Sequence, residues 1–86
     1  AFLLLATPGP TQSSRLGIVV AKKNIRLAVR RNRIKRLVRE HFRRHPFDKA
    51  IDLVVLARSG ADQLDNPGLW QELDKLWRAL GQKVNS

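Results

Sequence analysis

The groups that could do chemistry gather between Lys22 and His45, in the sequence KKNIRLAVRRNRIKRLVREHFRRH. Eleven of the 17 Lys and Arg residues lie in this stretch with a single acid, Glu40, so it carries the whole formal net charge of +10. Arginine forks pair with phosphate oxygens in a bidentate way, and Asn32 offers both a donor and an acceptor to a base, ribose or phosphate. The stretch therefore predicts a polyanionic partner, and its chemistry favours nucleic acid.

The spacing of the basic residues suits one face of a helix. On a helical wheel, a group of polar and basic side chains spans about 100° of the surface, and further bases flank it or precede the helix. The predicted nucleic-acid-binding residues are Lys22, Lys23, Arg26, Arg30, Arg31, Asn32, Arg33, Lys35, Arg36, Arg39 and Arg43. A merely solvated face is the alternative, but charges of one sign that are mostly Arg argue against it. A membrane-surface or calmodulin-type helix would use its apolar stripe for the partner, whereas here that stripe is needed to cover strands.

Catalytic groups are scarce. The two His residues, His41 and His45, are four apart and could face one metal ion, but HFRRH lacks the Glu of the HExxH pattern. The arginines beside them would also repel a cation, so we predict that His41 packs in the core and that there is no metal site. The chain has no Cys, its Ser residues lie in no nucleophile motif, and its carboxylates are dispersed. We expect no catalytic residue in this chain.

Hydrophobic periodicity supplies the elements that position the basic residues. Apolar segments predict strands at 1–6, 15–21 and 52–58, the last two covered on both faces, and Gly17 suggests a bulge or a close approach by another chain. Helices are expected at 27–45 and 66–81, and the apolar stripe of the first is Leu27, Ile34, Leu37, Val38, His41 and Phe42. The fold class is an α/β (α+β) two-layer sandwich, a single domain over 1–86 in which 15–21 and 52–58 are parallel neighbours joined by the basic helix.

Aromatic residues and helix ends give smaller predictions. Trp70 and Trp77, seven apart on the last helix, are expected to pack in the core. Asn66 and Pro67 resemble an N-cap followed by a first helical Pro, and Gly81 a C-cap. Phe2 could touch unpaired nucleotides if it faced the side of the basic helix.

The residues in order resemble a known family. The run RLGIVVAKK at 15–23, followed by AVxRNRIKRLVRExFR from Ala28 and by DLVVLAR at 52–58, is similar to the protein subunit of bacterial ribonuclease P. Arg31, Asn32 and Arg33 match the family's RNR signature. The resemblance covers about residues 15–60, and its central motif is long, ordered and specific.

The resemblance implies a small protein that joins a catalytic RNA and assists removal of the 5′ leader from precursor tRNA. The RNA would perform the hydrolysis with Mg²⁺ that it binds itself, and a central cleft of the protein would hold the single-stranded leader. The signature helix would lie in a left-handed crossover, an exception to the usual rule. Lys22, Lys23, Arg31, Asn32, Arg33, Lys35, Arg36 and Arg39 would contact the RNA or the precursor, and Phe2 the leader. The family normally begins with a further helix, so we expect this sequence to be N-terminally truncated.

A second hypothesis is a general RNA-binding or ribosomal protein without a role in cleavage. It explains the charge and the fold but not the ordered motif. A helix-based DNA regulator needs a second helix set against the first by a tight turn, whereas strands flank this helix, so we expect no DNA partner. The absence of Cys, of an export signal and of an apolar run long enough to span a membrane favours the cytoplasm.

Overall fold

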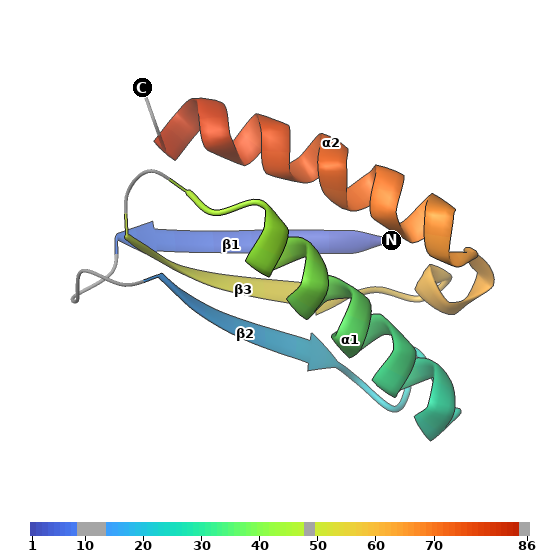
Figure 1. Cartoon of the computed structure of the whole chain (residues 1–86). Coiled ribbons are helices and arrows are strands. Elements are labelled where there is room, and N and C mark those ends of the chain that lie inside the picture. Colours follow the sequence, from blue (N-terminus) through green and yellow to red (C-terminus); the bar gives the residue numbers. More distant parts are fainter. Residues whose placement is uncertain (9–13, 48–49, 85–86) are drawn as a thin grey trace.

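The computed structural model describes residues 1–8, 14–47 and 50–84 (Figure 1). Its elements follow the predicted order of strand, strand, helix, strand and helix, with one short 3₁₀ turn before the last helix. Their bounds are β1 Phe2–Pro8, β2 Arg15–Val20, α1 Ala28–Arg44, β3 Ile51–Ala57, η1 Ala61–Gln63 and α2 Asn66–Val84. Neither helix of the described chain is long and apolar enough to cross a membrane.

The three strands form one sheet in the order β1-β3-β2. β3 pairs antiparallel with β1 and parallel with β2, and α1 connects the two parallel strands, as predicted. The register of β2 runs without interruption from Arg15 opposite Asp52 to Val20 opposite Ala57, so the bulge expected at Gly17 is absent. The left-handed sense of the crossover stays a prediction from the family resemblance.

Both helices pack against one face of the sheet (Figure 1). Burial alternates along β3, where Leu53 and Val55 are fully buried and the residues between them are half-buried. These core residues meet Ile34 and Val38 of α1 and Leu69 and Leu73 of α2, among others. The prediction that the parallel strands β2 and β3 are covered on both faces is therefore wrong within the described chain, because both helices occupy one side. On the other side Val19 of β2 is exposed, as are Leu3 and Leu5 of the neighbouring β1.

The first turn of α1 departs from the predicted apolar stripe. Leu27 precedes the helix in an extended conformation and is 57 % exposed, and Val29 is 80 % exposed. The buried part of the stripe begins instead at Ile34, and the first turns of α1 are bonded to the η1 region through Arg30 and Arg33. Ile34, Val38 and His41 are buried as predicted.

The beginning of α2 is fixed by a residue other than the predicted cap. The Asp65 carboxylate accepts a hydrogen bond from the Gly68 backbone N–H at 2.8 Å, so Asp65 rather than Asn66 satisfies the exposed amide of the first turn. At the other end, α2 continues through Gly81 to Val84 instead of stopping there. Trp77 is 6 % exposed in the core, as predicted, whereas Trp70 is only half-buried.

Candidate nucleic-acid interface

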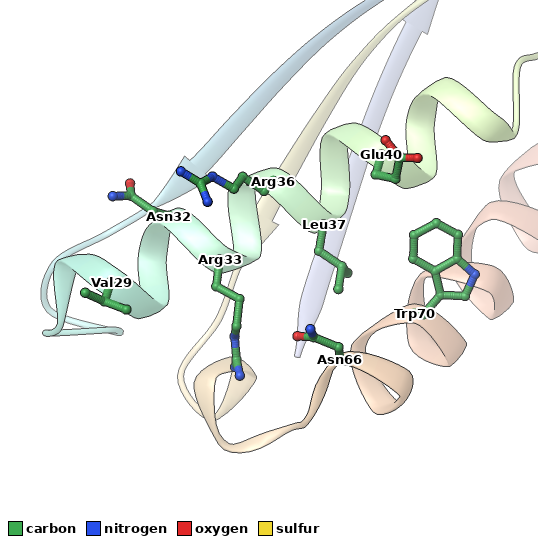
Figure 2. Close-up of a pocket in the computed structure, with 8 residues that line it drawn as sticks. All are labelled: Val29, Asn32, Arg33, Arg36, Leu37, Glu40, Asn66 and Trp70. Atoms are coloured by element: carbon green, nitrogen blue, oxygen red, sulfur yellow. The ribbon is translucent and has the colours of Figure 1, made fainter.

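The side of α1 that faces away from the sheet carries four residues that we call the outer arc: Asn32, Lys35, Arg36 and Arg39. Asn32, Arg36 and Arg39 are exposed and Lys35 is half-buried. In the described part of the chain, no hydrogen bond or ion pair holds any of these side chains. Figure 2 shows Asn32 and Arg36 projecting from the outer side of α1. The outer arc is therefore available to bind phosphate groups.

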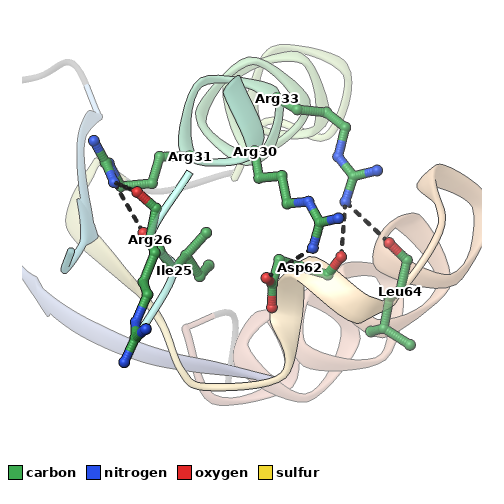
Figure 3. Close-up of polar contacts among 7 residues, drawn as sticks. All are labelled: Ile25, Arg26, Arg30, Arg31, Arg33, Asp62 and Leu64. Carbon is green, nitrogen blue, oxygen red and sulfur yellow. Dashed lines mark hydrogen bonds and ion pairs between the residues drawn. The ribbon is translucent and has the colours of Figure 1, made fainter. Parts of the chain in front are cut away.

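A second group of predicted RNA-binding residues is bound within the protein. Arg33 extends toward η1 and donates hydrogen bonds from Nη2 to the backbone oxygens of Leu64 at 3.1 Å and Asp62 at 3.5 Å (Figure 3). Arg30 donates from Nη1 to the Asp62 carboxylate at 3.2 Å. These two arginines hold the turn between β3 and α2 against α1.

Arg31 reaches in the opposite direction, toward the loop that precedes α1 (Figure 3). Its Nη1 donates to the backbone oxygens of Ile25 at 2.9 Å and Arg26 at 2.7 Å. Ile25 is 1 % exposed, so Arg31 closes a loop whose apolar residue is anchored in the core. We call Arg30, Arg31 and Arg33 the tethered arginines, because each is bound to a neighbouring loop or turn.

In the last turns of α1, the carboxylate of Glu40 pairs with two arginines of the same helix. Glu40 accepts hydrogen bonds from Arg43 Nη2 at 2.6 Å and from Arg44 Nε at 2.7 Å. The Arg43 guanidinium, helped by that of Arg44, holds the pKa of Glu40 below its ordinary value. Arg43, a predicted RNA-binding residue, therefore has a carboxylate partner already, although its side chain is 75 % exposed.

Three further predicted residues lie in the loop between β2 and α1. Lys22, Lys23 and Arg26 are exposed, and no side-chain bond holds them in the described chain. The loop itself is held by Asn24, whose Nδ2 donates to the Ala57 backbone oxygen at 3.4 Å. The loop thus presents two lysines and an arginine close to the first turn of α1.

A groove of about 740 Å³ runs between α1 and the beginning of α2 (Figure 2). Its walls combine apolar and polar groups: Val29, Asn32, Arg33, Arg36, Leu37, Glu40, Asn66 and Trp70. The sequence placed Trp70 in the core, but its indole lines this groove. The helical period correctly placed Trp70 on the same side of α2 as Trp77. It could not show that α1, and not the sheet, lies opposite the turn of α2 that carries Trp70.

Phe2 does not lie on an accessible surface. It is 6 % exposed and packs on the helix-covered face of the sheet, beside Leu76 and Leu80 of α2. This burial argues against the predicted contact between Phe2 and a leader. Successive side chains of a strand point to opposite faces of the sheet. Leu3 and Leu5 are therefore the apolar side chains of β1 that lie on the face opposite Phe2.

A polar cluster lies in the seam between α1 and α2. His41 is fully buried, and its Nε2 lies 2.7 Å from Oδ1 of Asp74. Burial lowers the pKa of His41, and the hydrogen bond to Asp74 opposes that shift. The sequence identified His41 as a packed residue correctly but missed Asp74, because the two positions are 33 residues apart and only the packing of the helices brings them together.

The structure thus separates the eleven predicted RNA-binding residues into two groups. Seven are unpaired in the described chain: Lys22, Lys23, Arg26, Asn32, Lys35, Arg36 and Arg39. Four are held by intramolecular partners: Arg30, Arg31, Arg33 and Arg43.

A family model described as Ribonuclease P matches residues 1–81. The chain belongs to the ribonuclease P protein family. The ribonuclease P protein component of Marinobacter nauticus is 46 % identical over 82 residues, which cover 95 % of this chain and 62 % of that protein. The ribonuclease P protein component of Pseudomonas aeruginosa is 51 % identical over 79 residues, covering 91 % of this chain and 58 % of the relative. The chain therefore spans about three-fifths of the length of these relatives.

Solved structures of the ribonuclease P protein family have the same fold. The Staphylococcus aureus RNase P protein superimposes with a TM-score of 0.84 at 32 % identity, over 92 % of this chain and 73 % of that one. The RNase P protein from Thermotoga maritima gives a TM-score of 0.77 at 36 % identity, over 91 % and 76 % of the two chains. The α+β arrangement predicted from the sequence is confirmed by these ribonuclease P protein structures.

Proposed function

We propose that this chain acts in the protein subunit of ribonuclease P, where it binds the catalytic RNA and assists removal of the 5′ leader from precursor tRNA. The observation that supports this most directly is the signature helix, whose outer arc presents unpaired Lys, Arg and Asn side chains in a chain of this family. Lys and Arg side chains on one helix contribute to binding because they release counterions from the RNA phosphates. This contribution does not depend on the RNA sequence.

The proposal assigns the chemical step to the RNA and to Mg²⁺ bound mainly by that RNA. Two acids near the basic surface are engaged within the protein, Glu40 with Arg43 and Arg44, and Asp62 with Arg30. In this proposal the protein has no catalytic residue, and its contribution is to position RNA and to offset phosphate repulsion.

The leader would lie on the open face of the sheet instead of against Phe2. Leu3, Leu5 and Val19 are the exposed apolar residues there, at 39 %, 53 % and 47 % exposure. In the register, Leu3 and Val19 both lie opposite Leu56, so they form one cross-strand row. An apolar row of this kind accommodates the faces of unstacked bases, which suits a single-stranded segment.

Cleavage at limiting Mg²⁺ tests the proposal. The chain is added to ribonuclease P RNA from Pseudomonas aeruginosa, at a Mg²⁺ concentration where that RNA alone is nearly inactive, and precursor tRNA cleavage is followed. The same test is run with the chain extended by the part of its Pseudomonas relative that the match does not cover, so that the shorter length of the chain does not decide the result. We expect faster cleavage and tighter binding of precursor than of mature tRNA.

A matched pair of variants makes the result specific. Replacing Lys35, Arg36 and Arg39 by Ala should abolish the gain, whereas Lys75→Ala, which removes an exposed base from α2, should preserve it. Absence of a gain with both forms of the protein would overturn the proposal. Equal affinity for precursor and mature tRNA would favour general RNA binding instead.

A further inference from the structure

The seam between α1 and α2 brings together three side chains that could bind a metal ion. His41, His45 and Asp74 each offer one ligand atom, and these atoms all lie within 4.8 Å of one another. The two His residues are one helical turn apart, and their rings stack at a centroid distance of 4.2 Å with an interplanar angle of 19°. The rings are nearly parallel, so their nitrogens point in similar directions, and a single ion requires the exposed His45 ring to turn toward Asp74 of α2.

The hydrogen bonds of His45 leave one of its nitrogens available. His45 Nδ1 lies 3.0 Å from the His41 backbone oxygen, which can only accept, so Nδ1 carries the proton. In the neutral ring, Nε2 then has the free lone pair, and it lies 3.9 Å from Asp74 Oδ1. A His whose other nitrogen donates to a backbone oxygen is the usual arrangement of a metal-binding imidazole.

The hydrogen bonds of His41 do not oppose metal binding. Its Nε2 is 2.7 Å from Asp74 Oδ1, and its Nδ1 is buried without a hydrogen-bond partner among the described residues. If a metal replaces the proton on Nε2, the ring proton moves to Nδ1. Nδ1 is unpaired in either tautomer, so this exchange loses no hydrogen bond at that atom.

Two of the three ligand distances require adjustments of about half an ångström, and the His45 ring must also turn out of its stack on His41. In a tetrahedral zinc site with bonds of about 2.0–2.1 Å, neighbouring ligand atoms lie about 3.3 Å apart. The distance of 2.7 Å between His41 Nε2 and Asp74 Oδ1 must open, and that of 3.9 Å between His45 Nε2 and Asp74 Oδ1 must close, each by about half an ångström. The side chains of His45 and Asp74 are 43 % and 35 % exposed, so water can take a fourth position.

Repulsion from the surrounding arginines is smaller than the sequence suggested. Arg43 and Arg44, which precede His45 in the sequence, are both turned to Glu40 at 2.6–2.8 Å. Arg39 belongs to the outer arc on the other side of α1 from His41. Arg78 of α2 does line the same pocket as His45 and Asp74, so it is the Asp74 carboxylate, and not a lack of nearby Arg, that favours a cation here.

We propose that His41, His45 and Asp74 form a binding site for Zn²⁺ that joins α1 to α2. Two imidazole nitrogens with one carboxylate oxygen favour a first-row transition ion over Mg²⁺ or Ca²⁺, which prefer oxygen ligands. A bound ion would fix the orientation of the signature helix relative to α2. The site goes beyond the proposed role in RNA processing and is independent of it.

The two Trp residues of the chain provide a direct measurement. The rings of Trp70 and Trp77 each lie 4.7 Å from the ring of His41, so a paramagnetic ion bound here quenches their fluorescence. Metal-stripped protein is titrated with Ni²⁺, and Zn²⁺ is then added as a competitor. Calorimetry with Zn²⁺ and thermal unfolding with and without Zn²⁺ complete the set, because an ion that binds the folded state raises Tm.

We expect saturable quenching that Zn²⁺ reverses and millimolar Mg²⁺ does not. His45→Ala and Asp74→Asn should each weaken Zn²⁺ binding by at least about tenfold and remove most of the Zn²⁺-induced rise in Tm. Because His45 is exposed, and because the amide introduced by Asp74→Asn can still accept a hydrogen bond from His41, both variants should fold, which unfolding in EDTA verifies.

Two matched controls change neighbouring residues that are not in the cluster. Arg44→Ala, next to His45, and Lys75→Ala, next to Asp74, should leave the Zn²⁺ affinity unchanged. Absence of Zn²⁺ binding in the unaltered chain would overturn the proposal. So would Zn²⁺ binding of equal strength in His45→Ala and Asp74→Asn, since the ion would then bind elsewhere.

Discussion

The outer arc and the tethered arginines lie on the same helix but have different partners. Arg36 and Arg39 are exposed and without intramolecular partners in the described chain, whereas Arg31 and Arg33 are half-buried and bound to backbone oxygens. One arginine of the RNR signature closes the loop before α1, and the other holds the turn before α2. Charge density alone therefore does not identify an RNA contact, because a guanidinium can serve the fold as well as a partner.

This difference predicts a separation of two measurable properties. Changes in the outer arc should alter RNA affinity and leave the free energy of unfolding almost unchanged. Changes in the tethered arginines should alter the free energy of unfolding first and RNA affinity mainly through the fraction of folded protein. Substitutions in each of the two groups test that separation.

The largest effect is expected from the outer arc. Replacing Lys35, Arg36 and Arg39 by Ala removes about three phosphate contacts, so the slope of log K against log salt should flatten by roughly 2 to 3. At about 0.1 M salt this corresponds to a loss of RNA affinity on the order of 10²- to 10³-fold. The free energy of unfolding should stay within about 0.5 kcal/mol for each exposed site. Filter binding across a salt series and urea unfolding measure the two quantities, and a parent-like slope would contradict the role of this arc.

The tethered arginines should give the converse result. Arg33→Ala removes hydrogen bonds from a charged donor to the backbone oxygens of Leu64 and Asp62, so we expect a loss of about 1–3 kcal/mol in stability. For a chain of this size that is a fall in Tm of roughly 4–8 °C per kcal/mol. Arg33→Lys keeps the charge but not the planar fork, so it should recover only part of the stability. Under conditions where Arg33→Ala is folded, its slope of log K against log salt should be close to that of the parent. A slope that flattens as much as in the outer-arc variant would instead show that Arg33 contacts the RNA.

The sequence was sufficient to predict most of the fold. Continuous apolar runs and a helical period located the three strands and two long helices of the described chain within about two residues at their starts, because apolar residues gather where the elements pack. The errors came from relations between elements. Nothing local indicates that both helices lie on one face of the sheet, so the open face and the buried position of Phe2 were missed.

The candidate site was predicted less well, for a related physical reason. Composition and order identified the basic helix and its family, but the partners of Arg33 and His41 lie about 30 residues away in the sequence. A helical wheel shows the direction in which a side chain leaves its helix and not what it meets. The division into outer arc and tethered arginines therefore becomes visible only when η1 and α2 are in place.

A smaller effect should follow from releasing the two arginines that are paired with Glu40. Glu40→Gln removes the carboxylate that holds Arg43 and Arg44, so two guanidiniums become available on the same helix as the outer arc. The added charge should steepen the salt slope by about 1 and strengthen RNA binding by several-fold. Exposed ion pairs contribute little, so the free energy of unfolding should be nearly unchanged. Lys75→Ala serves as the control for a charge change outside α1, and unchanged RNA affinity in Glu40→Gln would show that these arginines lie away from the RNA.

The smallest effect concerns the side of α1 opposite the outer arc, where His41 is buried against α2. The pKa of His41 is lowered by burial and partly restored by Asp74, with His45 also facing it, so folded His41 binds protons less readily than unfolded His41 does. The contribution of His41 to the free energy of unfolding is therefore fully present above the ordinary pKa of a histidine, about 6.5. It is lost as the pH falls below that value. Because Asp74 opposes the effect of burial, the dependence should be modest. Urea unfolding in EDTA at several pH values, compared between the parent and His41→Gln, isolates it. The parent should lose more stability than the variant on acidification, and parallel curves would mean that the buried imidazole accepts its proton as easily as an exposed one.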